Sequence, residues 1–172
     1  MTMHIYGCEP DSPAGEKFYR NVWAWHSLWT YCEDRHEDLA HRVHRPYASD
    51  GDGLDENEAT DLGWRLFFDL VHGIAEEYVD SRNAIVYALP NNECHICGGS
   101  GVRSDQVGED LSMPWRALDV DQAIKLGRAR GWCNYCRGEG RVLEFERSHR
   151  LSTVDIAEFA DFLVHSGGFE IY

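Results

Sequence analysis

The feature that most constrains this chain is a pattern of cysteines and glycines that occurs twice. The pattern Cys-x-x-Cys-x-Gly-x-Gly covers residues 94–101 and again residues 133–140. A Cys-x-x-Cys pair on a tight turn can direct both sulfurs to one point, and two such pairs complete a tetrahedral zinc site. The glycines permit the sharp turns and the close backbone approach that this site needs. We therefore predict one structural zinc ion with four ligands: Cys94, Cys97, Cys133 and Cys136.

Two other chemistries use paired cysteines, and both fit this chain less well. Redox dithiols occur singly beside a βαβ pattern. Disulfide frameworks are typical of secreted chains, whereas residues 1–30 lack the basic start, apolar core and cleavage site of a secretory leader. Cys8 and Cys32 have no partner at metal spacing and are interpreted as ordinary thiols. With no apolar run near the roughly 18 residues of a membrane span, we expect a cytoplasmic protein without membrane contact.

The cysteine motif resembles the repeat in the cysteine-rich region of DnaJ-type co-chaperones, where such repeats pair around zinc. That region carries four copies, and the two copies found here are enough for one site. The sequence has no His-Pro-Asp tripeptide, the signature of a J domain. The resemblance therefore implies a zinc module of the DnaJ type and not a complete co-chaperone.

Over most of its length the chain resembles a scattered family of small phage and prophage proteins. Besides both cysteine motifs, the resemblance is carried by residues 18–25 (Phe-Tyr-Arg-Asn-Val-Trp-Ala-Trp), 49–54 (Ser-Asp-Gly-Asp-Gly-Leu) and 167–171 (Gly-Gly-Phe-Glu-Ile). It implies a context, not an activity: small phage-borne proteins often act by binding host components. The location that it implies is the host cytoplasm.

Hydrophobic periodicity predicts a mainly helical fold. We expect one domain over residues 1–172, with a zinc module at residues 92–145 inserted between core helices, since 43% hydrophobic content is ample for a core. Apolar side chains recur at steps of four and three from Phe18 to Val43, which predicts a helix that begins near Gly15. A break near Ser27 or Glu33 is the alternative to one continuous helix.

Two apolar rows over residues 59–79 predict the central helix of the core, and the same periodicity continues to Leu89. A short strand over residues 84–89 is the alternative there. Asp55 and Glu58 form a capping-box pattern before this helix, and Ser152 and Asp155 form one before a last helix that stops at Gly167.

The acidic segment Asp50–Glu58 superficially resembles a calcium-binding loop. An EF-hand needs a ligand at its fifth position and glycine at its sixth, but counting from Asp50 those positions hold Leu54 and Asp55. We therefore interpret the segment as a turn followed by a capped helix.

Within the zinc module we expect a short helix over residues 120–130, after a polar loop over residues 104–113. Residues 141–145 alternate in polarity and predict a strand. It would pair with the residues after Gly101 in a short β hairpin, as in a small zinc ribbon or knuckle.

The formal net charge is −14, which opposes binding to duplex nucleic acid with its dense phosphate charge. Solubility is the simplest role of this acidity, and imitation of nucleic acid toward a basic partner is the alternative. Residues 103–150 differ from the rest, with nine basic side chains against eight acidic ones.

The candidate ligand-binding residues are Trp23 on the first predicted helix and a group of aromatic and arginine side chains near the zinc motifs. Aromatic faces stack on bases, and guanidinium groups hold phosphates. The candidates are Trp23, Trp115, Arg116, Arg128, Arg130, Trp132, Tyr135, Arg137 and Arg141. Trp25 and Trp29 lie on an apolar row and are expected in the core instead.

Two weaker histidine patterns remain. His36, His41 and His44 lie close together, but such histidines on a charged stretch are more often solvated than ligands. Cys32 and His36 have the spacing of a nucleophile and base on one helix, yet no third group is identifiable from the sequence. We assign no catalytic residue.

These observations favour a binding protein over an enzyme, because four cysteines fill the coordination shell of zinc and leave no position for a reactive water. The first hypothesis is a phage-type protein that captures a host component, either a defence-related nucleotide signal or a protein, to inhibit it. The second is a DnaJ-like accessory that binds unfolded or partner proteins. Homo-oligomerisation is compatible with both.

Overall fold

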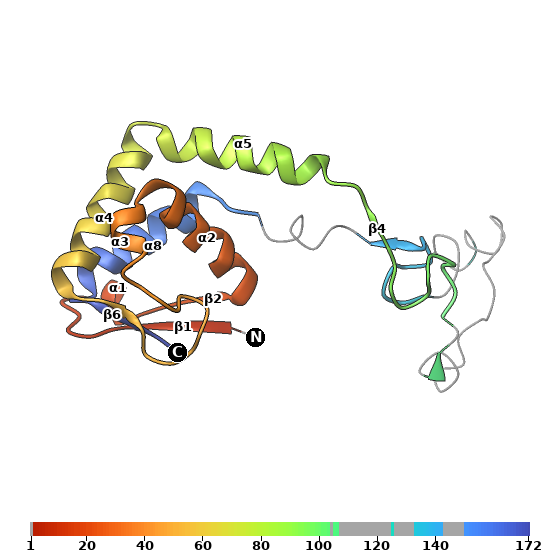
Figure 1. The fold of residues 1–172 in the computed structure, drawn as a ribbon, viewed down its shortest axis with the longest axis horizontal. Coiled ribbons are helices and arrows are strands. Elements are labelled where there is room, and N and C mark those ends of the chain that lie inside the picture. Colours follow the sequence, from red (N-terminus) through yellow and green to blue (C-terminus); the bar gives the residue numbers. More distant parts are fainter. Residues whose placement is uncertain (1, 104, 107–124, 126–132, 143–149) are drawn as a thin grey trace. The chain divides into compact units, whose positions relative to one another are not determined.

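The computed structural model describes residues 2–103, 105–106, 125, 133–142 and 150–172 (Figure 1). The chain forms two compact units. The first, here called the helical unit, comprises Met1–Tyr87 and His149–Tyr172. The second comprises Ala88–Ser148 and is called the zinc unit after the zinc site predicted for it. The predicted helix over residues 120–130 and loop over residues 104–113 lie almost wholly outside the described residues.

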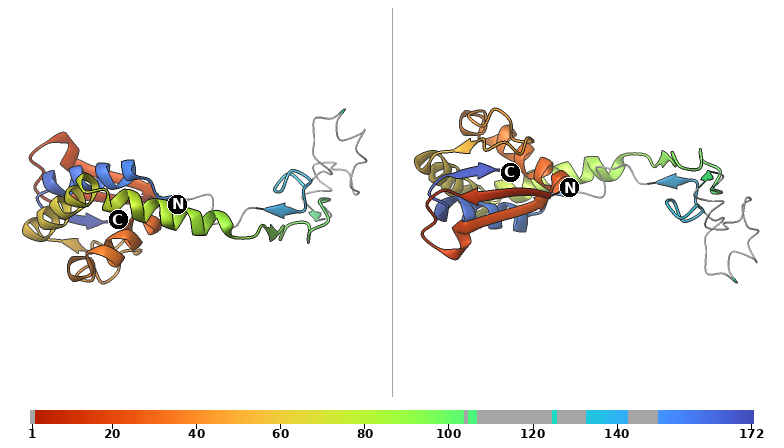
Figure 2. Two further views of the ribbon diagram at one scale, coloured as in Figure 1. Left: turned by 90° about the horizontal axis from the view of Figure 1, so that it is seen from above. Right: turned by 90° about the horizontal axis from the view of Figure 1, so that it is seen from below.

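A four-stranded antiparallel sheet joins segments from far apart in the sequence. Its strand order is β2–β1–β6–β3, with β1 at Thr2–Gly7, β2 at Lys17–Asn21, β3 at Gly53–Leu54 and β6 at Phe169–Ile171. Successive strand residues alternate between the two faces, so Met3, Ile5 and Phe18 are buried while their neighbours are exposed. The helices of this unit cover the buried face (Figures 1 and 2).

Six helices are described in the helical unit: α1 at Pro13–Glu16, α2 at Val22–Arg35, α3 at Glu37–Ala40, α4 at Glu56–Val71, α5 at Ile74–Ala88 and α8 at Thr153–His165. The most extensive contact between these helices is that of α4 with α8. Gly63 lets these helices approach closely, because a Cβ at this position would lie 2.8 Å from Cγ2 of Val164. The mainly helical class agrees with this architecture, although the four-stranded sheet was not predicted. None of the described helices is both long enough and apolar enough to span a membrane.

Large aromatic side chains fill the core between the sheet and the helices. Trp25 and Trp29 are fully buried, with ring centroids 5.3 Å apart, and Trp25 also meets Phe159 edge-on at 5.4 Å. The indole Nε1 of Trp25 donates a 2.7 Å hydrogen bond to the carbonyl of Pro46. Aromatic side chains bury the most area per residue, so this cluster anchors the fold. The expectation that both tryptophans belong to the core is confirmed.

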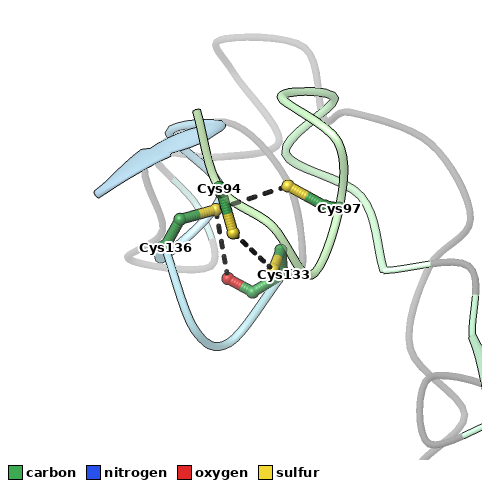
Figure 3. Close-up of side chains that lie close together, drawn as sticks. All are labelled: Cys94, Cys97, Cys133 and Cys136. Carbon is green, nitrogen blue, oxygen red and sulfur yellow. Dashed lines mark hydrogen bonds between the residues drawn. The ribbon is translucent and has the colours of Figure 1, made fainter. Parts of the chain in front are cut away.

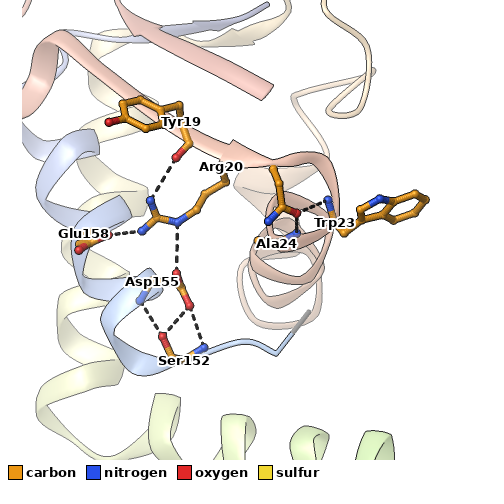
Figure 4. A network of polar contacts seen from close by, with 8 residues as sticks. Tyr19, Arg20, Trp23, Ala24, Ser152, Asp155 and Glu158 are labelled. Atoms are coloured by element: carbon orange, nitrogen blue, oxygen red, sulfur yellow. Dashed lines mark hydrogen bonds and ion pairs between the residues drawn. The ribbon is translucent and has the colours of Figure 1, made fainter. Parts of the chain in front are cut away.

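The predicted helix from Gly15 to Val43 is wrong at its start. Residues 17–21 form β2, in which Phe18 lies opposite Ile5 of β1. The helix begins at Val22, where Oδ1 of Asn21 accepts hydrogen bonds from the backbone N–H groups of Trp23 and Ala24 (Figure 4). Asparagine is a favoured N-cap because its side chain satisfies these first N–H groups.

The predicted helix is also interrupted, at a later residue than either of the two predicted breaks. It ends at Arg35, His36 has non-helical dihedral angles, and the chain continues as the short helix α3. The predicted break near Ser27 or Glu33 is therefore displaced to His36.

The predicted central helix is divided in two. α4 ends at Val71 and α5 begins at Ile74, since Gly73 adopts a positive φ of 73° that ends the first helix. The continuation of helix toward residue 89 is confirmed to Ala88, and the alternative strand there is wrong. The capping box of Asp55 and Glu58 is confirmed.

The last helix follows its predicted limits closely. The Ser152 side chain and backbone exchange hydrogen bonds with Asp155, which completes the predicted capping box (Figure 4). Asp155 also accepts a 3.2 Å hydrogen bond from Nε of Arg20, whose guanidinium further contacts Glu158. This network ties β2 to the start of α8.

The zinc unit has a two-stranded ladder that differs from the predicted one. β5 at Arg141–Val142 pairs with β4 at Asn92–Glu93, and not with the few described residues that follow Gly101. This antiparallel pairing joins the residues after the second cysteine motif to the residues that precede the first motif. The remainder of the predicted strand, residues 143–145, lies outside the described residues.

Candidate metal centre

The four predicted ligands converge on one point. Sγ of Cys94 lies 3.9 Å from Sγ of Cys133, Sγ of Cys97 lies 3.8 Å from Sγ of Cys136, and all four sulfurs lie within 4.8 Å of one another (Figure 3). A tetrahedral site with Zn–S bonds of about 2.3 Å has S–S edges of about 3.8 Å. The sulfur cage thus has the dimensions of a four-cysteine zinc site.

The two cysteine motifs hold each other in place by matching backbone hydrogen bonds. The N–H of Cys94 donates to the carbonyl of Gly140, and the N–H of Cys133 donates to that of Gly101, both at 2.9 Å. Each motif therefore closes the other with the last glycine of its repeat. This exchange explains why two complete copies of the pattern are needed for one site.

The last glycine of each motif also contacts a sulfur. The N–H groups of Gly101 and Gly140 lie 3.3 Å from Sγ of Cys97 and Cys136 respectively. Such N–H donors stabilise the thiolate form that binds a metal.

Glycine is required at these positions for a steric reason. A Cβ on Gly101 would lie 2.5 Å from the carbonyl oxygen of Gly138, and one on Gly140 would lie 2.2 Å from that of Gly99. Both glycines also have φ of 74°, a region that disfavours residues with a side chain. The last glycine of each motif is therefore a packing requirement of the paired arrangement.

The electrostatics of the cage favour a bound cation. Burial raises the pKa of Cys94, and burial raises that of Cys136 to about 12. For Cys97, burial opposes ionisation, but the Gly101 N–H and the neighbouring sulfurs outweigh it and lower the pKa. Four adjacent thiols cannot all ionise without a positive charge between them. A divalent ion supplies that charge, and four thiolates leave it no open position.

The structure places the other predicted ligand-binding residues in different parts of the molecule. Tyr135, Arg137 and Arg141 are exposed on the second motif and the strand after it. Trp23 belongs to the helical unit, where its exposed indole extends away from the start of α2 (Figure 4). The remaining candidates lie outside the described residues: Trp115, Arg116, Arg128, Arg130 and Trp132.

The helical unit contains a buried polar cluster that was not predicted from the sequence. Oδ2 of Asp69 accepts a 2.7 Å hydrogen bond from the Tyr31 hydroxyl and lies 3.0 Å from Nε2 of His36. Only 3% of Asp69 and 8% of His36 is exposed. One sequence pattern could have predicted it: Asp69 continues the row of Leu62 and Leu66 at helical spacing, so an acidic residue occupies a core position.

This cluster removes the basis for pairing Cys32 with His36 as nucleophile and base. Burial raises the pKa of the Cys32 thiol well above its usual range, so the thiol stays protonated. His36 is hydrogen-bonded to Asp69 instead. Within the described part of the chain, His36, His41 and His44 do not form a metal-binding cluster, and the four-cysteine group is the one found.

No family model, no curated protein and no solved structure matches the chain.

Proposed function

We propose that this protein is a zinc-stabilised, non-enzymatic binding protein of the phage type, which captures a host component to inhibit it. The component is a small nucleotide signal or a protein. The observation that carries the proposal is the buried four-sulfur cage, because a zinc ion held there has four protein ligands and no reactive water. The metal then shapes a surface instead of performing a reaction.

Exposed side chains on the second motif give that surface its chemistry. The Tyr135 ring meets the His95 ring at 4.8 Å in an edge-on arrangement and remains more than half exposed. Arg137 and Arg141 are exposed nearby in sequence. Because zinc orders both motifs, binding through these residues would depend on the metal.

The metal part of the proposal is tested by zinc content. Purified protein should carry one zinc per chain, and Cys97→Ser and Cys136→Ser should each lose most of it. Cys8→Ser is the matched control, since Cys8 is exposed and far from the cage in the sequence. Wild-type protein that is purified without metal and does not take up zinc would contradict the proposal.

The capture part is tested by native mass spectrometry and calorimetry against cyclic and ADP-ribose-type nucleotides, and against host proteins. Saturable, stoichiometric binding without turnover is the expected result. If a compound is instead consumed with enzyme-like kinetics, the non-enzymatic assignment is wrong.

A second candidate function is a DnaJ-like accessory that binds unfolded proteins. The observation in its favour is that two Cys-x-x-Cys-x-Gly-x-Gly motifs close one site, which is the unit of the DnaJ-type region. Suppression of aggregation of a denatured client, lost in Cys136→Ser and kept in Cys8→Ser, would support this function over capture.

A further inference from the structure

A pocket of about 460 Å³ opens on the helical unit between the end of α2 and the middle of α4. Its lining includes Arg35, His36, Trp64, Phe68, Asp69 and Ile74. Small-molecule sites in proteins typically have volumes of about 300–1,000 Å³ and combine apolar walls with a few polar groups. All lining residues belong to the same compact unit.

The rim of this pocket is aromatic and open to solvent. Trp64 is 59% exposed and Phe68 is 55% exposed, and they lie four residues apart on α4. Residues at this spacing share one helix face, so both rings border the same opening. Large aromatic side chains left in water are the usual stacking surface for flat ligands such as nucleobases.

One wall offers a guanidinium group with donors to spare. Nε of Arg35 lies 3.9 Å from Oδ2 of Asp69, which is an ion-pair distance but too long for a hydrogen bond. No hydrogen bond from the Arg35 guanidinium is found among the described residues. Its N–H groups are therefore available to an anionic group such as a phosphate.

The floor is built from groups that are held rigidly. Asp69 bonds to both Tyr31 and His36, and burial lowers the pKa of His36, so that its ring is neutral at pH 7. A buried carboxylate is costly unless it is fully paired. Placing it beneath a pocket is typical of a functional site, where polar groups are organised before the ligand arrives.

The charges around the pocket limit the ligand to a small anion. Arg65, which also lines the pocket, is already paired with Asp61 at 2.8 Å and with Asp38 at 3.0 Å. Those carboxylates would repel a ligand with several phosphates. One base and one phosphate match the aromatic rim and the Arg35 guanidinium, which is ion-paired with Asp69 but has N–H donors left for a ligand.

The described pocket beside the cysteine motifs is less suitable for such a ligand. Its charged lining consists of Glu93, Glu139 and Arg141, which are two carboxylates against one guanidinium. This balance opposes phosphate binding.

We infer that the pocket of the helical unit binds a nucleoside monophosphate group, with the base stacked on Trp64 and the phosphate held by Arg35. The inference rests on the nucleotide form of the proposed function and moves the nucleotide site away from the zinc unit. Phe68 and Ile74 border the base, and His36 and Asp69 keep the floor of the site fixed.

The test is isothermal titration calorimetry of the full chain, loaded with zinc, against AMP, GMP, CMP and UMP. We expect Trp64→Ala and Arg35→Gln each to weaken binding about 10-fold or more. Trp64 is 59% exposed and the Arg35 side chain is 41% exposed, so neither substitution should disrupt the core. Matched controls are Tyr19→Ala, an exposed aromatic residue elsewhere in this unit, and Arg42→Gln, whose guanidinium contacts Glu58. The controls should bind as the wild type does.

Adenosine separates the two contacts, since it lacks the phosphate. Its weaker binding should be lost in Trp64→Ala and unchanged in Arg35→Gln. Nucleotide binding that persists in both variants but is lost in Arg137→Gln or Arg141→Gln would overturn the inference and leave the proposed function standing.

Two further results would also overturn the inference. The first is that none of the four monophosphates binds. The proposed function would still stand in that case if the protein captures a host protein. In the second, sedimentation shows that Trp64→Ala splits a dimer, which would make the aromatic rim a contact between copies. If a nucleotide is consumed, the non-enzymatic assignment fails, and the pocket is supported only if both variants abolish that consumption.

Discussion

At the residue scale, the balance between burial and hydrogen bonding decides the protonation state of the Tyr31–Asp69–His36 cluster. Burial raises the pKa of Tyr31, and its hydrogen bond to Asp69 raises it further, so the hydroxyl remains a donor. For His36, burial lowers the pKa and outweighs the attraction of Asp69. A neutral imidazole that donates from Nε2 to the carboxylate satisfies both partners.

This cluster should make the helical unit less stable in mild acid. His36 has its ordinary pKa near 6.5 when unfolded and a lower one when folded, so below pH 6.5 the unfolded chain binds more protons. The contribution of His36 to the free energy of unfolding is complete above pH 6.5. It is lost as the pH falls toward the lowered pKa of His36 in the folded state. Urea unfolding of the wild type should therefore show a lower free energy of unfolding at pH 5 than at pH 7.

His36→Gln is the control, because its amide can still donate to Asp69 but does not titrate. Its loss of stability between pH 7 and pH 5 should be smaller than that of the wild type. Equal losses in the two proteins would assign the pH dependence to other groups.

A second residue-scale prediction concerns Arg137, which has φ of 55° in the left-handed region. The matching position of the first motif is Gly98, with φ of 54°. The left-handed region costs a residue with a side chain roughly 1–2 kcal/mol in the folded state. Glycine avoids this cost but loses more conformational entropy on folding, which destabilises the fold by about 0.5–1 kcal/mol. Arg137→Gly should therefore stabilise the zinc unit by up to about 1 kcal/mol.

Competition with a chelator measures this change, and a higher chelator concentration should be needed to remove zinc from Arg137→Gly. Arg141→Gly is the control, since Arg141 lies in β5, where glycine gains nothing and weakens the strand. Easier removal of zinc from Arg137→Gly would show that the arginine side chain contributes more than its backbone costs.

At the element scale, predictions succeeded where the signal was local and failed where a distant segment decided the outcome. The capping residues Asp55 and Ser152 mark helix starts through contacts within three residues, and both were predicted. β2 was mistaken for helix because its partner, β1, lies elsewhere in the sequence, and apolar spacing near Phe18 fits either structure. Asp69 was missed because its partners come from a distant segment: Tyr31 lies in α2, and His36 follows the end of that helix.

The close contact of α4 with α8 gives a prediction at the same scale. Ala at position 63 would favour the helix by about 1 kcal/mol, but its Cβ would lie 2.8 Å from Cγ2 of Val164 and 3.1 Å from the carbonyl oxygen of Ala160. The Val164 side chain is stiff and the second contact is with backbone, so neither neighbour can move away easily. The cost of overpacking, about 1–3 kcal/mol, should therefore exceed the gain in helix propensity. Thermal unfolding of Gly63→Ala should show a lower Tm than that of the control Thr60→Ala. A Tm above the wild type would mean that the helices separate without cost.

At the scale of the whole molecule, two different sources of stability hold the two units. The helical unit has an aromatic core around Trp25, Trp29 and Phe159. In the described part of the zinc unit, the buried cluster consists of the four cysteines, with Ile96 and Val142 packed against it. So small an apolar cluster contributes little to offset the entropy of ordering this described part, and the proposed metal would add to its stability. The cysteine motif was readable from the sequence because its ligands and glycines are set by short spacings.

Removal of the metal should therefore open one unit and leave the other closed. In hydrogen–deuterium exchange with a strong chelator, the amides of Gly101 and Gly140 should lose protection, since their hydrogen bonds run to the cysteine sulfurs. Peptides from α4 and α8 should exchange as before, because their packing involves no metal ligand. Readdition of zinc should restore protection in the first group. Loss of protection in α4 and α8 on chelation would instead show that the units fold as one.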